Sequence, residues 1–279
     1  MRRMIYKFFI CISIITVLCS VVTGGMYIYM RFVIKSEMSF DEFLRTRFAS
    51  VSHSQNADAS GSQKIDETAG ENADGEIDIE IDFETLKTVN KASVGWIYQK
   101  DTPISYPVVQ GADNDYWLYR RFNSTDKTKG SNQSGTIFVD YRCDVKDGNN
   151  LILYGHNMAK ENGVKFSSLI NYVKDGGEDY LKEHPSFVYF DGETGKGCVY
   201  MIFSVMKADV STQERADRYY KAVSDEEYAD YLEFLKSESL WDTGVEPSED
   251  ARCVLLSTCV TGHYDVRCLI AGIATKTEE

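Results

Sequence analysis

The amino-acid sequence predicts a mainly β fold, a β-barrel with a few inserted helices. Short runs rich in β-branched and aromatic residues are typical of strands, and they cover residues 136–140, 151–154, 187–190, 198–206, 253–258 and 266–271. The Gly-rich segment 191–197 has the composition of a hairpin loop and joins two of these runs. Many short strands with few helices are typical of a barrel decorated by helices.

The first thirty residues include a segment that is apolar enough to span a membrane. Residues 8–30 contain no charged side chain and no proline, and as a helix they extend about 35 Å. Arg2, Arg3 and Lys7 precede this segment and favour a cytoplasmic tail over residues 1–7. A cleaved signal peptide is the alternative, but the apolar run is longer than an ordinary signal core. We therefore expect an uncleaved single-pass anchor with the rest of the chain outside the cell.

Residues 31–81 are predicted to form a juxtamembrane segment followed by a flexible stalk. Residues 37–48 favour a short helix, whereas residues 50–75 are rich in Ser, Asn, Ala, Gly and acidic residues. No aromatic residue lies between Phe48 and Phe83, so this stretch cannot bury enough apolar surface to offset its ordering entropy. The folded domain is therefore expected to span residues 82–279.

Two helices are expected inside this domain. Apolar residues recur at i, i+3, i+4 and i+7 over residues 166–173. Ser224 and Glu227 have the spacing of a capping box ahead of a second apolar-periodic segment that reaches residue 235. Both helices interrupt the series of strands.

The composition excludes one large class of partner. The net charge is −13, and Lys and Arg are not clustered beyond the first few residues. Nucleic-acid binding is not expected, because phosphate contacts need concentrated positive charge.

The cysteine count indicates a free thiol outside the membrane. Two of the seven cysteines lie in the apolar segment, which leaves an odd five beyond it, and at least one of these is unpaired unless it bonds another chain. An exported domain that keeps a free thiol often uses it. Four of the five are expected to be small buried hydrophobes: Cys143, Cys198, Cys253 and Cys268.

Three segments carry residues that suit acyl-transfer chemistry. The apolar strands 151–154 and 253–258 end just before His156 and Cys259, and Arg267 lies on the strand that follows directly. A thiolate attacks carbonyls far better than a thiol, and a neighbouring imidazole can take the proton and return it to a leaving amine. A guanidinium can stabilise the oxyanion. Each residue also has an ordinary structural interpretation, and the sequence alone does not establish that the three converge.

A metal site is not expected. Cys259, His263 and Cys268 lack the paired spacing of zinc ligands, and the acidic residues of 76–84 lack the spacing of a calcium loop. The sequence therefore predicts no cofactor.

These segments together resemble the sortase signature. The sequence Leu-Ser-Thr-Cys ends at Cys259, an arginine follows eight residues later, and His156 comes directly after a glycine. Residues 95–121, residues 135–142 and the helix at 224–237 resemble class B sortases in particular. The resemblance implies a closed eight-stranded sortase-type barrel with N-terminal helices and a helix inserted before the last strands. It makes residues 82–279 a catalytic domain and the anchor a tether in the cell membrane.

The resemblance also implies roles and partners. Cys259 would be the nucleophile, His156 the general acid and base, and Arg267 the donor to the oxyanion or substrate carbonyl. Residues expected to contact the substrate peptide or to lie at the rim of the site are Ser257, Thr258, Asn114, Tyr116 and His263. The substrates would be surface proteins with a C-terminal sorting motif, and the acceptor a peptidoglycan precursor or another amine.

Three other functions fit parts of the pattern. A pilin-type polymerase would use a lysine of another protein as acceptor, and a plain cysteine hydrolase would use water. A cell-surface binding module would use neither, and the complete set of thiol, imidazole and guanidinium argues against it.

Overall fold

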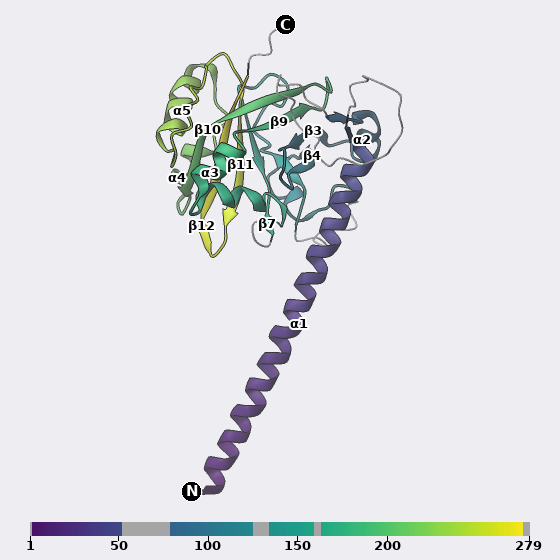
Figure 1. The fold of residues 1–279 in the computed structure, drawn as a ribbon, viewed down its shortest axis with the longest axis vertical. Helices are drawn as coiled ribbons and strands as arrows, with labels where there is room; N and C mark the ends of the chain where they lie inside the picture. The colour runs from purple at the N-terminus through teal and green to yellow at the C-terminus, as the bar shows by residue number, and fades with distance from the viewer. Residues whose placement is uncertain (1, 52–78, 125–133, 159–162, 276–279) are drawn as a thin grey trace, which may run out of the picture. The chain divides into compact units, whose positions relative to one another are not determined.

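The computed structural model describes residues 2–51, 79–124, 134–158 and 163–275, which divide into two compact units, residues 1–40 and 41–279. The first unit is helical and belongs to helix α1 (Arg2–Phe48) (Figure 1). Within α1, the segment Phe9–Phe48 is long and apolar enough, by length and composition, to cross a membrane. The other described elements all belong to the second unit.

The second unit is a closed barrel of eight strands, which confirms the predicted fold class. Around the barrel the order is β10-β12-β11-β6-β5-β4-β3-β9. The β4–β5 and β6–β11 pairs are parallel and the others are antiparallel. The strand bounds are β3 Ser93–Tyr98, β4 Ser105–Gln110, β5 Ile137–Val139, β6 Asn150–Tyr154, β9 Ser186–Asp191, β10 Gly197–Asp209, β11 Cys253–Val260 and β12 His263–Ala274.

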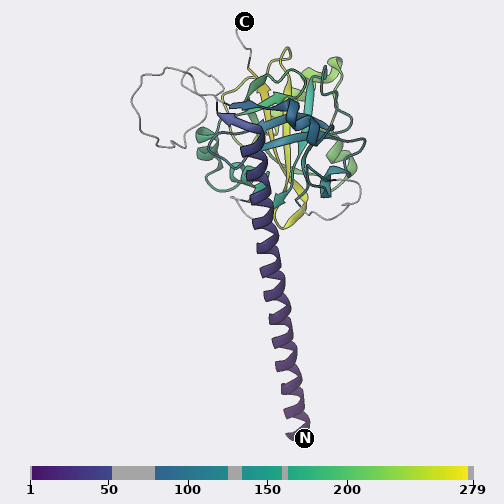
Figure 2. The same cartoon turned by 90° about the vertical axis from the view of Figure 1, so that its right-hand side faces the viewer.

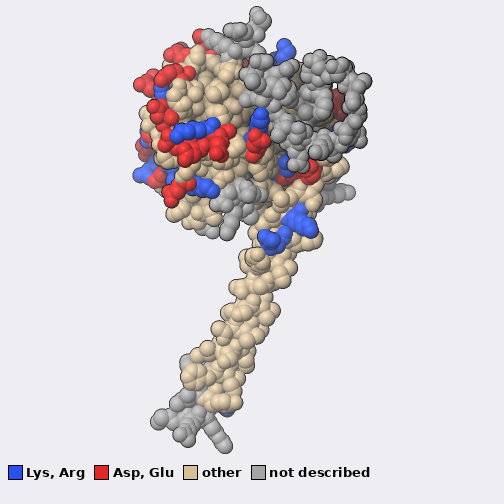
Figure 3. Space-filling model, viewed as in Figure 1, with Lys and Arg blue, Asp and Glu red and all other residues tan. Residues whose placement is uncertain are grey.

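Shorter elements surround the barrel. Two small antiparallel pairs form, β1 (Ala49–Val51) with β2 (Ile79–Ile81) and β7 (Asn157–Met158) with β8 (Val164–Lys165). The helices are α2 Phe83–Val89, η1 Trp117–Tyr119, η3 Ser167–Val173, α3 Gly177–Glu183, α4 Gln213–Tyr219 and α5 Asp225–Ser237. Figures 1 and 2 show α4 and α5 on the outside of the barrel, and acidic and basic side chains are interspersed over the face that carries them (Figure 3).

Strands β3 and β4 were not predicted, and close packing explains the glycine that interrupts the first of them. A Cβ atom on Gly95 would lie 2.4 Å from the Tyr189 hydroxyl and 2.7 Å from the Phe190 carbonyl. The strand therefore needs glycine where β9 crosses close to it. Local composition does not reveal this requirement, because β9 lies about ninety residues further along the chain.

The two predicted helices form with altered details. Within residues 166–173, Ser167–Val173 form the 3₁₀ helix η3 rather than an α-helix. Helix α5 begins after Ser224 as expected, but the Ser224 hydroxyl donates to the Glu227 carboxylate at 3.4 Å instead of capping a backbone N–H. The capping box is therefore absent, although the helix is correctly placed.

The second unit begins earlier than residue 82. Leu44 and Phe48, at the end of α1, are 2% and 3% exposed, and the Phe48 ring makes an edge contact with Phe122. Strand β1 then pairs with β2, and the Asp82 N–H donates to the Phe48 carbonyl at 2.9 Å. Residues 41–51 and 79–81, expected to belong to the linker, are thus parts of the barrel unit, because buried apolar contacts hold both ends. Most of the predicted stalk, residues 52–78, lies outside the described residues.

The barrel interior sets the stability of this unit. Leu151 on β6 is fully buried, whereas Leu240 is 46% exposed. We expect Leu151→Ala to lower the free energy of unfolding by about 2–5 kcal/mol, because the removed methyl groups leave a cavity. The matched variant Leu240→Ala is expected to change it by less than about 1 kcal/mol. Urea unfolding of both variants measures the difference, and equal losses would contradict this assignment of the core.

Candidate active site

The predicted nucleophile and the predicted oxyanion donor are held opposite each other by the β11–β12 ladder. Cys259 near the end of β11 and Arg267 on β12 are direct register partners. Paired residues in an antiparallel ladder point to the same face of the sheet. Cys259 is exposed, and Arg267 is half-buried beside it. The predicted oxyanion donor therefore lies on the strand next to the predicted nucleophile.

The histidine lies on the other side of the cysteine. Strand β6 runs parallel to β11, and the residues flanking His156 are both bonded to β11. The Gly155 N–H donates to the Ser257 carbonyl at 3.1 Å, and the Asn157 amide donates to the Cys259 carbonyl at 2.9 Å. Neighbouring strands lie about 4.8 Å apart, so the order across this end of the sheet is histidine, cysteine, arginine. The structure brings all three predicted catalytic residues together.

The glycine before the histidine is required by packing. A Cβ atom on Gly155 would lie 2.5 Å from a terminal carbon of Ile137 and 2.6 Å from the ring of Phe166. Both of those side chains are fully buried, at 1% and 0% exposed. Only glycine lets the backbone pass between them and reach the position from which His156 stands beside β11.

The surroundings of His156 favour a neutral ring. Its Nε2 lies 2.8 Å from the Leu118 carbonyl; since a carbonyl only accepts, Nε2 carries the proton and the neutral ring keeps its lone pair on Nδ1. Burial lowers the pKa of His156, the bond to Leu118 opposes this effect, and the charge of Lys165 lowers the pKa further. The Tyr119 ring, from η1, lies 5.7 Å from the imidazole and helps to hold it. A neutral imidazole is the form that can accept a proton from a thiol.

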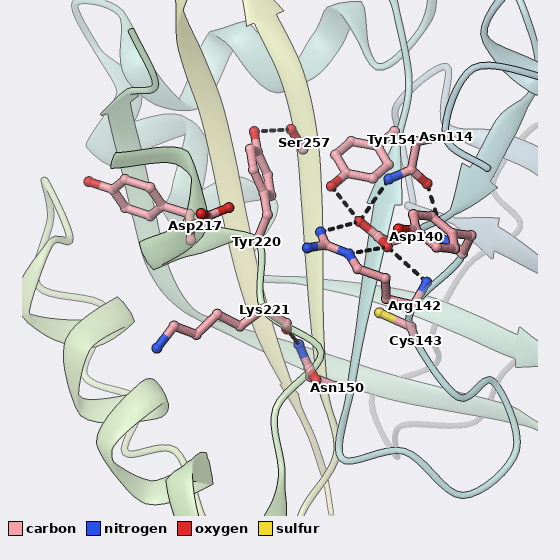
Figure 4. Close-up of polar contacts among 12 residues, drawn as sticks. Asn114, Asp140, Arg142, Cys143, Asn150, Tyr154, Asp217, Tyr220, Lys221 and Ser257 are labelled. Atoms are coloured by element: carbon pink, nitrogen blue, oxygen red, sulfur yellow. Dashed lines mark hydrogen bonds and ion pairs between the residues drawn. The ribbon is translucent and has the colours of Figure 1, made fainter. Parts of the chain in front are cut away.

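A tyrosine that sequence reasoning missed lies against the site. The Tyr220 hydroxyl and the Ser257 hydroxyl are 2.9 Å apart (Figure 4), and the Tyr220 ring packs on Tyr154 at 5.4 Å. Burial raises the pKa of Tyr220 to about 12; the Ser257 bond and the charge of Arg267 oppose this, and Cys259 adds to it. Tyr220 follows α4 in a loop that carries no sequence signal for a site.

A buried carboxylate joins the two strands that precede the site. Asp140 is fully buried and accepts from the Tyr154 hydroxyl at 2.9 Å, from the Asn114 amide at 3.0 Å and from both ends of the Arg142 guanidinium (Figure 4). Burial alone would raise the pKa of Asp140, but these hydrogen bonds hold it below its ordinary value. Sequence reasoning also missed Asp140 and Tyr154, although both stand at the ends of predicted strands, as Cys259 does.

The other predicted contact residues occupy varied positions. The Thr258 side chain is 2% exposed, and its hydroxyl has no hydrogen-bond partner within the described part of the chain. The Asn114 amide is engaged by Asp140, as described above. Tyr116 instead packs under Arg120, whose guanidinium carbon lies 3.8 Å from its ring centroid. His263 is exposed at the start of β12, where it pairs with Val260.

The cysteines differ in exposure as the sequence suggested. All seven are free thiols, and Cys259 is the exposed one within the described residues of the barrel unit. Of the four expected to be buried hydrophobes, three are buried and Cys198 is half-buried. The Cys268 thiol donates to the Leu169 carbonyl at 3.2 Å, which directs it toward η3. No cluster of three potential metal ligands occurs among the described residues.

Comparison with known proteins shows to which family the chain belongs. No family model matches the chain. A curated sortase B from Listeria monocytogenes, however, is 34% identical over 199 residues, which cover 70% of this chain and 73% of that protein. This chain belongs to the sortase B family. The Staphylococcus aureus sortase B is 31% identical over 195 residues, covering 69% of this sortase and 73% of its own length.

The fold comparison agrees with the sequence relatives. A solved sortase B from B. anthracis superposes on this sortase with a TM-score of 0.63 at 26% identity, covering 90% of this chain and 100% of that chain. The predicted resemblance is thereby confirmed, as is the enzyme class: this protein is a cysteine transpeptidase. Sortases are cell-envelope enzymes that act on sorting-motif substrates and amine acceptors.

The lowered pKa of His156 predicts a pH-dependent loss of stability. The ordinary value is 6.5 and the folded value lies below it, so between the two the unfolded chain binds more protons than the folded sortase. The stabilising effect is present above pH 6.5 and is lost as the pH falls through the folded pKa. We expect His156→Gln to reduce the loss of stability between about pH 7.5 and about pH 5.5, measured by urea unfolding. If the free energy of unfolding falls equally with pH in the native protein and in His156→Gln, the lowered pKa of His156 is not the cause of the loss.

Asn157 is predicted to hold the nucleophile in place. Its amide donates to the Cys259 carbonyl at 2.9 Å and to the Thr261 hydroxyl at 3.0 Å, joining the end of β11 to the turn beyond it. We expect Asn157→Ala to lower kcat/KM about tenfold, because misplacing a reacting group by a fraction of an ångström is costly. Steady-state kinetics on a cleavable peptide measures it. An unchanged kcat/KM would show that the turn is held without this amide.

Proposed function

We propose that this sortase cuts a peptide bond through a thioester on Cys259 and transfers the acyl group to an amine. The observation that carries this proposal is the order of three side chains across adjacent strands: His156 after β6, Cys259 on β11 and Arg267 on β12. Acyl transfer requires a nucleophile, a base to activate it and a donor to stabilise the oxyanion, and these three side chains lie side by side on adjacent strand ends.

In the proposed reaction His156 takes the proton of the Cys259 thiol, and the sulfur attacks the carbonyl carbon of the substrate. The carbonyl oxygen becomes an oxyanion, which Arg267 stabilises. The carbon–nitrogen bond then breaks as His156 returns the proton to the leaving amine, and a thioester remains. An incoming amine gives its proton to His156 and attacks the thioester, which forms a new peptide bond and releases the thiol.

Peptide contacts are proposed on the face that carries the nucleophile. Ser257 precedes Cys259 by two residues, so both side chains point to the same face of β11, and the Ser257 hydroxyl already contacts Tyr220. Thr258, one residue before Cys259, points to the opposite face of β11, and its buried hydroxyl is proposed to act from there, while His263 is exposed at the neighbouring turn. Asn114 and Tyr116 complete the proposed set, with Asn114 acting from the Asp140 network.

The substrates are proposed to be surface proteins that end in a sorting motif of the Pro-x-Thr-Gly or Asn-Pro-x-Thr-Asn kind. The acceptor is proposed to be a cell-wall amine of a peptidoglycan precursor. Residues 8–30 would hold the enzyme in the membrane as a single-pass anchor, with residues 1–7 in the cytoplasm and the barrel outside. The apolar segment of α1 supports this topology by its length and composition.

The decisive experiment offers quenched peptides with candidate motifs to the full chain in detergent, with and without a short glycine peptide or diaminopimelate. Products and any enzyme-linked acyl species are followed by mass spectrometry. We expect an amine-joined product and a thioester adduct in the native protein. Both should vanish in Cys259→Ala, because the variant has no nucleophile.

The other outcomes separate the alternative functions. Cleavage that yields only water-derived product with every amine tested would favour a hydrolase. An acyl-enzyme that is resolved by a protein lysine would favour a pilin-type polymerase. A Cys259→Ala variant as active as the native chain would overturn the proposed mechanism, and the absence of any reaction or adduct across a broad motif library would favour a binding module.

A further inference from the structure

A buried ion pair lies beside the segment that carries His156. Lys165 in β8 has 5% of its side chain exposed and Asp41 has 1%, and the Lys165 Nζ lies 2.6 Å from the Asp41 Oδ1. Buried charges are retained in proteins where they are paired, since removing one partner strands the other in a medium of low dielectric. This pair joins residues 124 positions apart.

The lysine is also constrained through its backbone. Its φ angle is +63°, a left-handed conformation that is uncommon for a side chain of this kind. The Lys165 N–H donates to the Tyr106 hydroxyl at 3.0 Å, and the ammonium lies 4.9 Å from the centroid of the same ring. Such a conformation persists only where its surroundings fix it. Here a carboxylate from α1 and a tyrosine from β4 supply that constraint.

Two backbone links connect the constrained Lys165 to the residues around His156 and Cys259. Lys165 is the register partner of Asn157 in the β7–β8 pair, and Asn157 is bonded to the carbonyl of Cys259. The next residue, Phe166, donates its N–H to the His156 carbonyl at 3.0 Å. The backbone of residues 165 and 166 is thus tied to the segment 156–157, which carries the imidazole.

We propose that the Asp41–Lys165 pair is a positioning device that sets the β7–β8 strand pair, and through it His156, against Cys259. The proposal rests on the proposed role of His156 as acid and base. It assigns a part in catalysis to the last turns of α1, which belong to the barrel unit and lie beyond the proposed anchor of residues 8–30.

A purely stabilising role is the alternative, and paired substitutions separate the two. The double variant Asp41→Leu with Lys165→Met removes both charges while keeping apolar volume, and such replacements are often neutral or stabilising. If the pair only stabilises, this variant should be as active as the native chain. If the pair sets geometry, the apolar side chains lose the directional contact, and turnover should fall in a protein that remains stably folded.

The test uses the full chain in detergent, with a cleavable sorting-motif peptide that the native protein accepts. For the double variant we expect kcat to fall by about tenfold or more with little change in KM, because the imidazole and not the peptide contacts is misplaced. The unfolding temperature should be equal to or above that of the native protein. A stability control is Leu86→Ala, a fully buried position on α2, which should lower the unfolding temperature and leave kcat unchanged at a temperature where the protein is folded.

Two results would overturn the inference. Native kcat in the double variant would reduce the pair to a structural role, as would a loss of kcat in Leu86→Ala that matches its loss in the double variant. His156→Ala, measured in parallel, guards the premise: if it retains native activity, the proposed function itself fails. If it is inactive while the double variant is native-like, the positioning proposal alone fails.

Discussion

The hydrogen-bond register of β6, β11 and β12 is the constraint on which the site depends. Side chains along a strand alternate between faces, so a slip of one residue would move Cys259 to the face opposite Arg267. Register in turn depends on burial, because β11 is fully buried from Cys253 to Thr258 and every displaced apolar side chain would cost free energy. The fold therefore specifies the order of the three proposed catalytic residues through its core, and those residues themselves contribute little to that choice.

Buried polar side chains further fix the positions of the strands that end at the site. Asp140, Tyr154, Tyr220 and Ser257 form two hydrogen-bonded clusters whose rings meet at Tyr154 and Tyr220. In a medium of low dielectric such contacts are strong when complete and costly when broken, so they rigidify the strands that end at the site. The same medium lowers the pKa of His156, which suits its proposed role because a neutral imidazole can accept a proton.

The sequence predicted the features that depend on local order along the chain. The strands that carry His156 and Cys259 are continuous apolar runs, and Arg267 follows Cys259 after a short turn, so these three residues could be found without coordinates. The glycine at 95 made β3 look unlike a strand, because its reason is a tyrosine from β9. Tyr220 gave no signal either, because its hydroxyl contact with the site is to a residue 37 positions away.

The N-terminal boundary of the barrel unit is the clearest feature that the sequence could not predict. Composition alone separates the apolar helix from the barrel by a long polar stretch, yet β1 pairs with β2 across that stretch and Asp41 reaches Lys165. A fragment beginning at residue 82 would lack Asp41 together with the buried side chains of Leu44 and Phe48, and would so lose both the ion pair and this apolar packing. The end of α1 therefore belongs to the folded barrel unit, because its apolar side chains and Asp41 are buried there, whereas composition alone places it in the linker.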